Sequence, residues 1–279
     1  MIDKPIVFEI SDGVYAVNEF GLDSMFVVIG EKEAAVIDTG MGCFDFRALV
    51  ESITDKPYRV LLTHGHLDHV GGMDQFDEVW LHPADVPAAR KVTREGRIAS
   101  CKRMRGLEGD PDVWSYADES PREWEKTPAM RELCDGMCFD LGGRTIRTVF
   151  TPGHSAGSCS FIDSKSRILF SGDACNVSLM VTDCSVETEL EGLKRLKALE
   201  GEFDRNFNGH LGFSSGMTHI SMPESILDDC IEACGRILAG KAVPCTAAKS
   251  RWAERGEVRT CLYGAVSLTW CPANEKGGD

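Results

Sequence analysis

The sequence lacks the features that would send a chain into or across a membrane. None of its apolar stretches reaches the roughly 18 residues that a transmembrane helix needs. Its N-terminus, MIDKPIVFEISDG, has neither the basic start nor the long apolar region of a signal peptide. We therefore expect a cytoplasmic protein that has no membrane partner.

Positive charge is also scarce. The chain has 30 Lys and Arg residues against 44 Asp and Glu residues, which gives a net charge of −14. A field of that sign repels phosphate backbones, so nucleic acid is not an expected partner. The chain has 279 residues, of which 43% are hydrophobic, and this is enough to bury a sizeable core. We expect a single domain over 1–279.

The C-x-x-C spacing is missing, although the chain has 12 cysteines. Its absence argues against a zinc ribbon and against a thioredoxin-like redox motif. The cysteines are scattered from Cys43 to Cys271, and in a cytosolic chain of this size we expect them to be mostly buried free thiols.

Strand signals come in two blocks, and each block is followed by helical sequence. Short β-branched segments separated by Gly, Asp and Ser predict strands and a hairpin over 6–38, and further strands over 58–64 and 78–83. The second block covers 143–154, 158–174 and 203–210. This pattern predicts an α/β fold in which two sheets pack together with helices outside.

Helices are predicted over 45–52, 85–105, 121–133, 186–201 and 223–238. The stretch 258–270 is predicted to be one final strand. The charge-rich segment 84–136 interrupts the pattern of strands, so we expect it to be an inserted, mainly helical cap.

Only seven histidines are present, and three of them lie in LLTHGHLDHVGG, at 61–72, directly after an apolar run. Alternate residues of an extended segment point the same way, so His64 and His66 can bind one ion. Asp68 and His69 follow in the turn and can face a second ion. Imidazole and carboxylate ligands suit zinc, and also manganese or iron. Polar residues at a strand end are the structural alternative, but four potential ligands in six positions favour a metal site.

Three further segments place a possible ligand after a strand and a glycine: FTPGHSAGS with His154, ILFSGDA with Asp173 and FNGHLG with His210. Glycine allows the close backbone approach that aims a ligand at an ion. Each segment is a weak signal alone, because a histidine after a turn is more often a surface residue. Together they place five of the seven histidines in one scheme.

These segments resemble, in order, the motifs of the metallo-β-lactamase superfamily. AAVIDTG resembles the first motif, THGHLDH the second, TPGHSAGS the third, FSGDA the fourth and NGHLG the fifth. The resemblance covers about residues 10–215. It implies an αββα sandwich with a dinuclear metal site at one edge of the packed sheets.

The resemblance also implies the ligands and the cofactor. The first ion would be held by His64, His66 and His154, the second by Asp68, His69 and His210, and Asp173 would bridge the two. Asp38 resembles the carboxylate that orients a ligand histidine. The expected cofactor is a pair of divalent ions, with zinc preferred over manganese or iron.

A water between two divalent cations loses a proton near neutral pH and becomes a nucleophile, and the ions stabilise the charge that develops on the substrate. Asp68 can take up or pass on a proton, and Asp173 would bridge the two ions. These two are therefore the predicted catalytic residues. True β-lactamases of the superfamily typically lack the bridging aspartate, so Asp173 argues against that activity. We expect a metal-dependent hydrolase acting on a small carboxylic ester-like substrate, either a thioester or a lactone.

Three alternatives stay open at this point. One is a persulfide dioxygenase-like oxidoreductase with a single iron, and another is a phosphodiesterase, since two metals suit in-line displacement. The third is a catalytically inactive binding protein on the same scaffold, against which the complete ligand set argues.

The cap contains ARKVTREGRIASCKRMRG, which carries seven Arg or Lys residues and one Glu. We expect Arg103 and Arg105 to form a cationic wall that receives an anionic small-molecule substrate. A solvated helix face is the more common explanation of such a charge run.

Aromatic residues of the cap are further candidates for substrate contact. Trp114 and Tyr116, with Trp124, can line an apolar pocket, although packing inside the cap is the simpler explanation. His219 follows the fifth motif closely and can approach the substrate. His82 is predicted to be structural.

Overall fold

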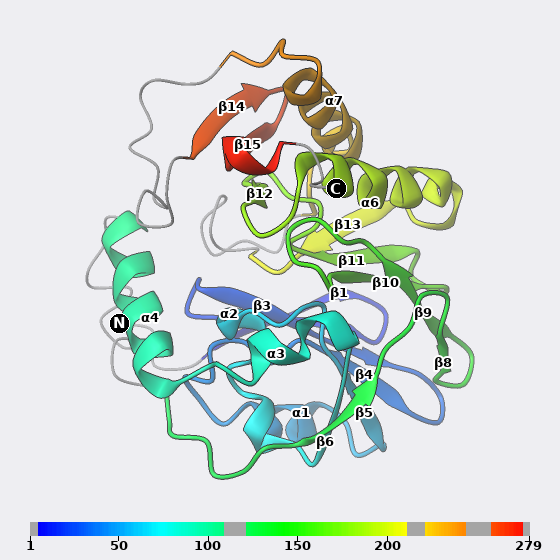
Figure 1. The fold of residues 1–279 in the computed structure, drawn as a ribbon. Helices are drawn as coiled ribbons and strands as arrows, with labels where there is room; N and C mark the ends of the chain where they lie inside the picture. Colours follow the sequence, from blue (N-terminus) through cyan, green and yellow to red (C-terminus); the bar gives the residue numbers. More distant parts are fainter. Residues whose placement is uncertain (1–4, 109–120, 211–220, 244–257, 276–279) are drawn as a thin grey trace.

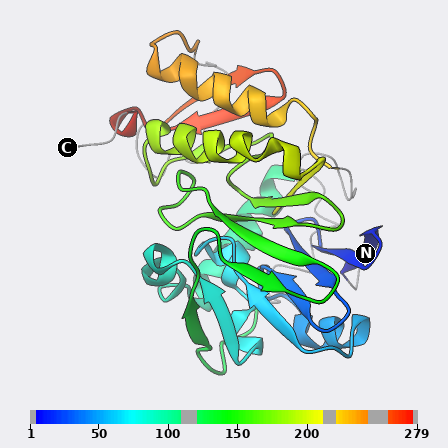
Figure 2. The ribbon, with the colours of Figure 1, turned by 90° about the vertical axis from the view of Figure 1, so that its right-hand side faces the viewer.

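The fold is a sandwich of four layers, as the computed structural model shows for residues 5–108, 121–210, 221–243 and 258–275. Two β-sheets pack face to face, and helices cover their outer faces (Figures 1 and 2). Helix α1 (Phe46–Ile53) covers the first sheet, whereas α6 (Val186–Ala198) and α7 (Ile226–Leu238) cover the second. The predicted αββα arrangement is therefore confirmed.

The first sheet has seven strands that are neighbours in chain order. They are β1 (Ile6–Ser11), β2 (Val14–Glu19), β3 (Asp23–Ile29), β4 (Ala34–Ile37), β5 (Tyr58–Leu61), β6 (Glu78–Leu81) and β7 (Ala129–Glu132). The first four run antiparallel, which confirms the predicted hairpin between β3 and β4. The pairs from β4 to β7 are parallel, so each needs a crossover connection.

Short helices supply these crossovers. They are α1, α2 (Leu67–Val70), the 3₁₀ turns η1 (Met73–Gln75) and η2 (Pro83–Asp85), α3 (Val86–Ala89) and α4 (Arg94–Glu108). Helix α1 begins where the Asp45 side chain accepts a hydrogen bond from Ala48 N (3.0 Å), and Phe46 and Val50 face the sheet.

The second sheet has the order β13-β11-β10-β9-β8. Its strands are β8 (Cys138–Asp140), β9 (Thr145–Phe150), β10 (Cys159–Asp163), β11 (Ile168–Gly172) and β13 (Arg205–Asn208). The pair β11–β13 is parallel, and α6 with η3 (Glu200–Glu202) forms its crossover. A small third sheet has the order β12 (Met180–Val181), β15 (Val266–Trp270), β14 (Arg259–Tyr263), and η5 (Pro272–Asn274) follows it.

Two of the predicted elements are wrong. The segment predicted as a helix over 121–133 instead provides β7, because Pro128 restricts the residue before it to extended conformations and the chain then pairs with β6. The single strand predicted over 258–270 is a hairpin. Gly264 has φ +53° and turns the chain between β14 and β15, where a Cβ atom would lie 2.2 Å from Asp229 Oδ1.

Three apolar clusters fill the spaces between the layers. Between the sheets, Phe26 of β3 contacts Phe170 of β11 with ring centroids 4.7 Å apart. A second cluster lies between the first sheet and α1, and a third joins the second sheet, α6, α7 and the small sheet. Seven of the cysteines are buried as free thiols, whereas Cys134 and Cys138 are exposed, so the prediction for cysteine holds for most of those described.

Backbone hydrogen bonds also tie the two large sheets together at both ends of their strands. At one end, Cys159 N donates to Thr63 O (2.8 Å) and Ser24 N donates to Gly209 O (2.7 Å). At the other end, Glu31 N donates to Gly142 O (2.8 Å). The separation of the sheets is therefore set by the main chain as well as by the packed side chains.

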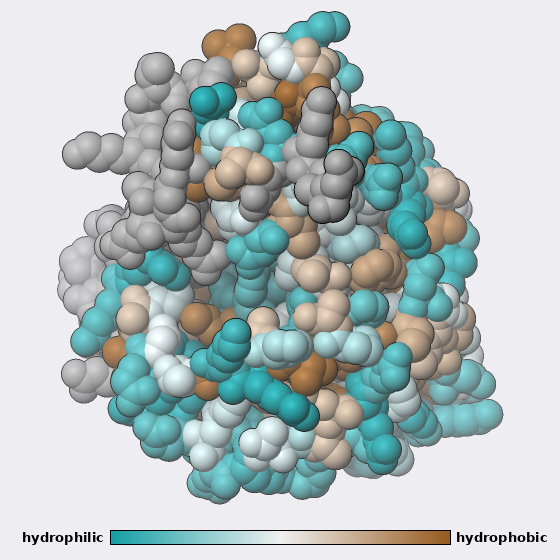
Figure 3. Space-filling model, in the orientation of Figure 1, coloured by the Kyte–Doolittle hydropathy of each residue, from teal (hydrophilic) through white to brown (hydrophobic). Residues whose placement is uncertain are grey.

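The surface is mixed in character. On the face drawn in Figure 3, hydrophilic and hydrophobic side chains are interspersed over the coloured part. The large hydrophobic residues that are exposed, among those described, are Val7, Val243 and Leu262. None of the described helices has both the length and the apolar character needed to cross a bilayer.

A buried acid and a buried base hold the loop that follows β4. Glu19 is fully buried and accepts hydrogen bonds from Met41 N (2.5 Å) and Cys43 N (2.7 Å). Arg97 of α4 donates to Met41 O (3.1 Å) and Gly71 O (2.9 Å), so it fastens α4 to the first sheet. One of the seven cations of the segment ARKVTREGRIASCKRMRG is therefore structural.

Burial raises the pKa of Glu19 to about 7, although the two backbone donors and Arg97 oppose the shift. The unfolded carboxyl titrates near 4.5, so its contribution to stability is complete below that pH and is lost as the pH rises through about 7. We expect wild-type protein in chelator to lose about 2 to 3 kcal/mol more unfolding free energy between pH 5 and pH 8 than Glu19→Gln does, since one pKa unit is about 1.4 kcal/mol. Urea unfolding of both proteins at the two pH values measures this difference, and equal losses would contradict it.

Candidate metal centre

Seven polar side chains meet at one end of the sandwich, where strands of both sheets end. The first sheet contributes His64 and His66 from the loop after β5, and Asp68 and His69 from α2. The second sheet contributes His154 after β9, Asp173 after β11 and His210 after β13. The structure thus brings together all seven residues that the sequence motifs singled out.

Three histidines form the first group, which has the arrangement of a possible metal site. His64 Nε2 lies 3.1 Å from His66 Nδ1, and His66 Nδ1 lies 2.9 Å from His154 Nε2. His64 and His154 are buried, and His66 is partly exposed. The three nitrogens converge on one point, which suits a single cation bound by imidazole ligands.

Asp68, His69 and His210 form the second group. His69 Nε2 lies 4.0 Å from Asp68 Oδ1, and His210 Nε2 lies 4.0 Å from Asp68 Oδ2. Asp173 stands between the two groups, because one of its oxygens, Oδ2, is 3.1 Å from His210 Nε2 and 3.6 Å from His154 Nε2. A carboxylate in that position can serve both groups.

The outward-facing nitrogens of these histidines have their own partners. Nδ1 of His154 lies 2.9 Å from Met180 O, and Nδ1 of His210 lies 2.9 Å from Leu22 O. A carbonyl oxygen can only accept, so each Nδ1 carries a proton and Nε2 is the nitrogen that faces the centre. Metal binding requires that Nε2 release any proton it carries.

Asp38 orients His69 in the same way. Its Oδ2 lies 2.9 Å from His69 Nδ1 and accepts from Thr63 Oγ1 (2.7 Å), and its Oδ1 accepts from Thr63 N (2.7 Å). Asp38 is 2% exposed and has φ +60°, a left-handed conformation that aspartate and asparagine tolerate better than most residues.

Two buried atoms at the centre lack hydrogen-bond partners within the described part of the chain, which bears on whether ions fit there. His69 Nε2 and Asp173 Oδ1 are buried, lie 3.7 Å apart and have no hydrogen-bond partner among the described residues. Buried polar atoms are nearly always paired, so such orphans call for a further partner. Nitrogen and carboxylate donors in two adjacent groups fit a pair of divalent ions such as zinc, manganese or iron.

The charges around the centre shift its pKa values in opposite directions. Burial lowers the pKa of His64 and of His154, and the neighbouring histidines lower it further. Burial alone would also lower the pKa of His210, but Asp173, Asp23 and Asp68 outweigh it and raise the pKa well above its usual value. The carboxylates thus give the side of the centre formed by the second group and Asp173 more negative charge than the side formed by the first group.

The structure describes only some of the other predicted site residues. Arg103 is exposed on α4, with its guanidinium 3.1 Å from Ser100 Oγ. Arg105 lies on the same helix, but its side chain is outside the described part of the structure, as are Trp114, Tyr116 and His219. Trp124 is partly buried, packs against the core of the first sheet and donates to Gly71 O (2.8 Å).

Sequence reasoning missed three acids beside the centre. Asp183, which follows β12, accepts a hydrogen bond from His66 Nε2 (3.0 Å) and leaves Nδ1 to face the first group. Asp23 lies 3.4 Å from His210 Nδ1. Asp85 binds the loops around His64 and His154. Asp85 carries a signal that could have been used, since it follows the end of β6 at the same edge of the sheet.

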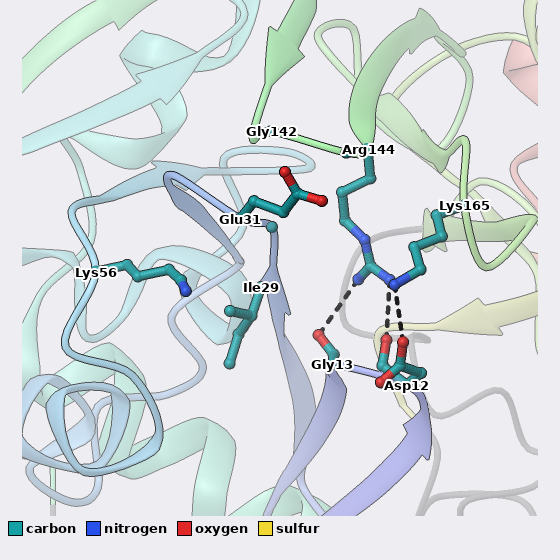
Figure 4. Close-up of a pocket in the computed structure, with 10 residues that line it drawn as sticks. Asp12, Gly13, Ile29, Glu31, Lys56, Gly142, Arg144 and Lys165 are labelled. Carbon is teal, nitrogen blue, oxygen red and sulfur yellow. Dashed lines mark hydrogen bonds and ion pairs between the residues drawn. The ribbon is translucent and has the colours of Figure 1, made fainter.

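A separate cavity of about 310 Å³ lies among the hairpin turns at the opposite end of the strands (Figure 4). Two of its charged groups are paired with neighbours: Arg144 donates to Asp12 O (2.9 Å) and Gly13 O (3.3 Å), and Lys165 donates to Asp12 Oδ2 (2.8 Å). The turns after β1, β3, β8 and β10 surround it, whereas the seven residues of the centre follow the other strand ends.

Comparison with known proteins supports this assignment of the fold. The family model described as "Metallo-beta-lactamase superfamily" matches residues 19–180. The solved structure of ST1585, an archaeal protein of that superfamily from Sulfolobus tokodaii, superposes with a TM-score of 0.55 at 20% identity and covers 87% of this chain and 93% of that one.

Two relatives have thioesterase names. "Acyl-coenzyme A thioesterase MBLAC2" from Bos taurus is 27% identical over 181 residues, which are 59% of this chain and 64% of that protein. "Atrochrysone carboxyl ACP thioesterase" from Aspergillus fumigatus is 27% identical over 171 residues, 60% of this chain and 44% of that protein. The match thus spans less than two thirds of the length of either relative.

Proposed function

This chain belongs to the metallo-β-lactamase superfamily, and from that membership we propose that it is a dinuclear metal-dependent hydrolase of thioesters. The observation that carries the proposal is the convergence of seven potential ligands in two adjacent groups. The two relatives named as thioesterases support the choice of substrate class.

In this proposal every residue of the centre has a place. The first ion would be held by His64, His66 and His154, the second by Asp68, His69 and His210, and Asp173 would be shared. When bound, two divalent ions would supply a water of lowered pKa as the nucleophile and would polarise the substrate carbonyl. Zinc is the preferred metal, with manganese or iron as alternatives.

The residues of the chain orient the reaction. Asp68 has 21% of its side chain exposed, so it faces both the centre and the solvent from which substrate arrives. It can therefore take up the proton that the attacking water gives up. The imidazoles are fixed in place by Asp38, Met180 O and Leu22 O, so little reorganisation is needed at the moment of reaction.

Hydrolysis of a thioester suits such a centre. The oxygen of water forms a bond to the acyl carbon, the C–S bond breaks with its electron pair going to sulfur, and the products are a carboxylic acid and a thiol. A thiol ionises near pH 8.5, so the sulfur can leave as a thiolate at neutral pH. A lactone alkoxide is far more basic and needs a proton as it leaves.

The test combines metal analysis with a substrate panel. Protein purified without oxygen is measured for metal content and assayed with acyl-CoA, glutathione thioester, lactone and phosphodiester substrates. About two zinc or manganese ions with thioester turnover are expected. One iron with no hydrolysis would overturn the proposal in favour of a dioxygenase. Turnover of only lactones or only phosphodiesters would overturn the substrate class.

The proposal predicts that an exposed cation on α4 contributes to the binding of an anionic substrate. Arg103 is exposed on the helix that Arg97 fastens beside the centre. Arg103→Glu is expected to raise KM about 3- to 10-fold for acyl-CoA and to leave a short neutral thioester unaffected, since an exposed charge contact is worth about 1 kcal/mol. Steady-state kinetics with both substrates measures this. The control, Lys194→Glu, makes the same charge change on the exposed face of α6, on the other side of the molecule in Figure 1. Equal effects on the two substrates would contradict the prediction.

A further inference from the structure

Asp85 is a buried carboxylate that touches both of the loops carrying the first group of histidines. It lies in η2, just after β6, and is 3% exposed. Its Oδ2 accepts from Gly65 N (2.8 Å) and Ser155 Oγ (2.6 Å), and its Oδ1 accepts from Gly157 N (2.7 Å). Both oxygens thus accept hydrogen bonds.

The donors belong to different sheets. Gly65 lies between His64 and His66, in the loop that leaves the first sheet. Ser155 and Gly157 directly follow His154, in the loop between β9 and β10 of the second sheet. One side chain therefore connects the loop that carries two histidines of the first group to the loop that carries the third.

The two glycines show how closely the loops fit around this side chain. A Cβ atom on Gly157 would lie 2.7 Å from Asp85 Cγ and Oδ1, and one on Gly65 would lie 2.6 Å from Asp85 O. Neither position has space for a side chain unless Asp85 moves. The approach of the two loops is therefore set by Asp85 and by the absence of side chains opposite it.

We propose that Asp85 is a positioning residue for the first group, holding His154 at its distance from His64 and His66 and so setting the affinity of that group for a divalent ion. This inference rests on the proposed function. A buried carboxylate loses its hydration, and here three donors from the two loops replace it. The second group has its own support in Asp38, and none of the three donors to Asp85 directly neighbours one of its residues, so the effect of Asp85 is expected to be larger at the first group.

Two variants disturb the connection in different ways. Asp85→Asn keeps the shape, but its NH₂ group faces a donor in place of an acceptor, so at least one loop contact is lost. Gly157→Ala keeps the carboxylate and displaces it with a methyl group. Asp163→Asn is the matched control, because Asp163 is also fully buried and also binds a turn, accepting from Ser166 Oγ (2.5 Å), but at the far end of β10.

The experiment measures binding to each group separately. Metal-free full-length proteins are titrated with cadmium and followed by cadmium NMR, in which a site with three imidazoles and a site with carboxylates give distinct signals. Zinc affinity is measured by competition with a chromophoric chelator. Asp85→Asn and Gly157→Ala are expected to weaken the first site about 10- to 100-fold, and to change the second by less than about 3-fold. Asp163→Asn is expected to change neither, and thermal unfolding in chelator reports how far each variant stays folded.

The outcomes separate the inference from the function beneath it. Wild-type protein that binds no ion would overturn the proposed function, and the inference with it. Wild-type protein that binds two ions, with Asp85→Asn and Gly157→Ala unchanged or equally weakened at both sites, would overturn the inference alone. If Asp85→Asn does not fold, Gly157→Ala decides the matter, because it removes no hydrogen-bonding group.

Discussion

Replacing Asp173 with asparagine is expected to lower kcat/KM for thioester hydrolysis by about 1,000-fold or more and to reduce bound metal from about two ions to about one. The Asp173 carboxylate is the charged group shared by both histidine groups, 3.1 Å from His210 Nε2 and 3.6 Å from His154 Nε2. Asparagine preserves the shape but removes the negative charge that offsets the repulsion between two cations. Steady-state kinetics and elemental analysis of the same preparation measure both effects.

Two histidine variants accompany that experiment, one inside the centre as a second test and one outside it as a control. His66→Ala removes a nitrogen of the first group and is expected to abolish hydrolysis as well. His82 lies outside the centre, stacks on Phe150 at 4.5 Å and accepts from Ala84 N (3.3 Å), so it is structural, as predicted. His82→Ala should keep its metal and its activity. Full activity in Asp173→Asn or in His66→Ala would refute the assignment of the centre.

The second large effect is expected from Asp38→Asn. The Asp38 carboxylate accepts from Thr63 N and Thr63 Oγ1 and lies 2.9 Å from His69 Nδ1. Asparagine has one acceptor oxygen, so its NH₂ group would face either Thr63 N or the donors at Oδ2. When it faces His69, the imidazole proton must move from Nδ1 to Nε2, the nitrogen that faces the centre. We expect the affinity of the second site for zinc to fall about 10- to 100-fold.

Chelator competition, read by the cadmium signals of the two sites, measures this change. Asp45→Asn removes the same charge from the same connection between β4 and α1 while keeping the cap of α1, since asparagine is an equally good N-cap, and it should leave both affinities unchanged. Undiminished zinc affinity of the second site in Asp38→Asn would show that the carboxylate does not control the imidazole proton.

The seven residues of the centre could be predicted because their signals are local. Five of the seven follow a strand within five residues, and Asp68 and His69 complete the short run that His64 and His66 begin. The fold then has only to bring the ends of β5, β9, β11 and β13 to the same end of the sandwich. The alternation of strands and helices carries that information, so the sandwich could be predicted as well.

Apart from that of Asp38, which the first motif indicated, the supporting contacts could not be predicted because they join residues far apart in the sequence. Asp85 binds residues 20, 70 and 72 positions away, and Asp183 meets His66 across 117 positions. Such pairs become visible only once the register of both sheets is known. The strand β7 was missed for another reason: it is four residues long at the edge of the sheet, and three of its residues are exposed, so it lacks the apolar alternation of a strand.

The main-chain ties between the two sheets bear on how such a protein can change over evolutionary time. Cys159 N and Ser24 N link the sheets beside the centre, and Glu31 N links them at the other end. Because those links involve no side-chain atoms, they can persist when the interior residues between the sheets, such as Phe26 and Phe170, are exchanged for others. The interior residues can then diverge within one lineage while the chemistry stays the same. New substrate preferences can arise in the loops while the two groups of the metal centre keep their distance from each other.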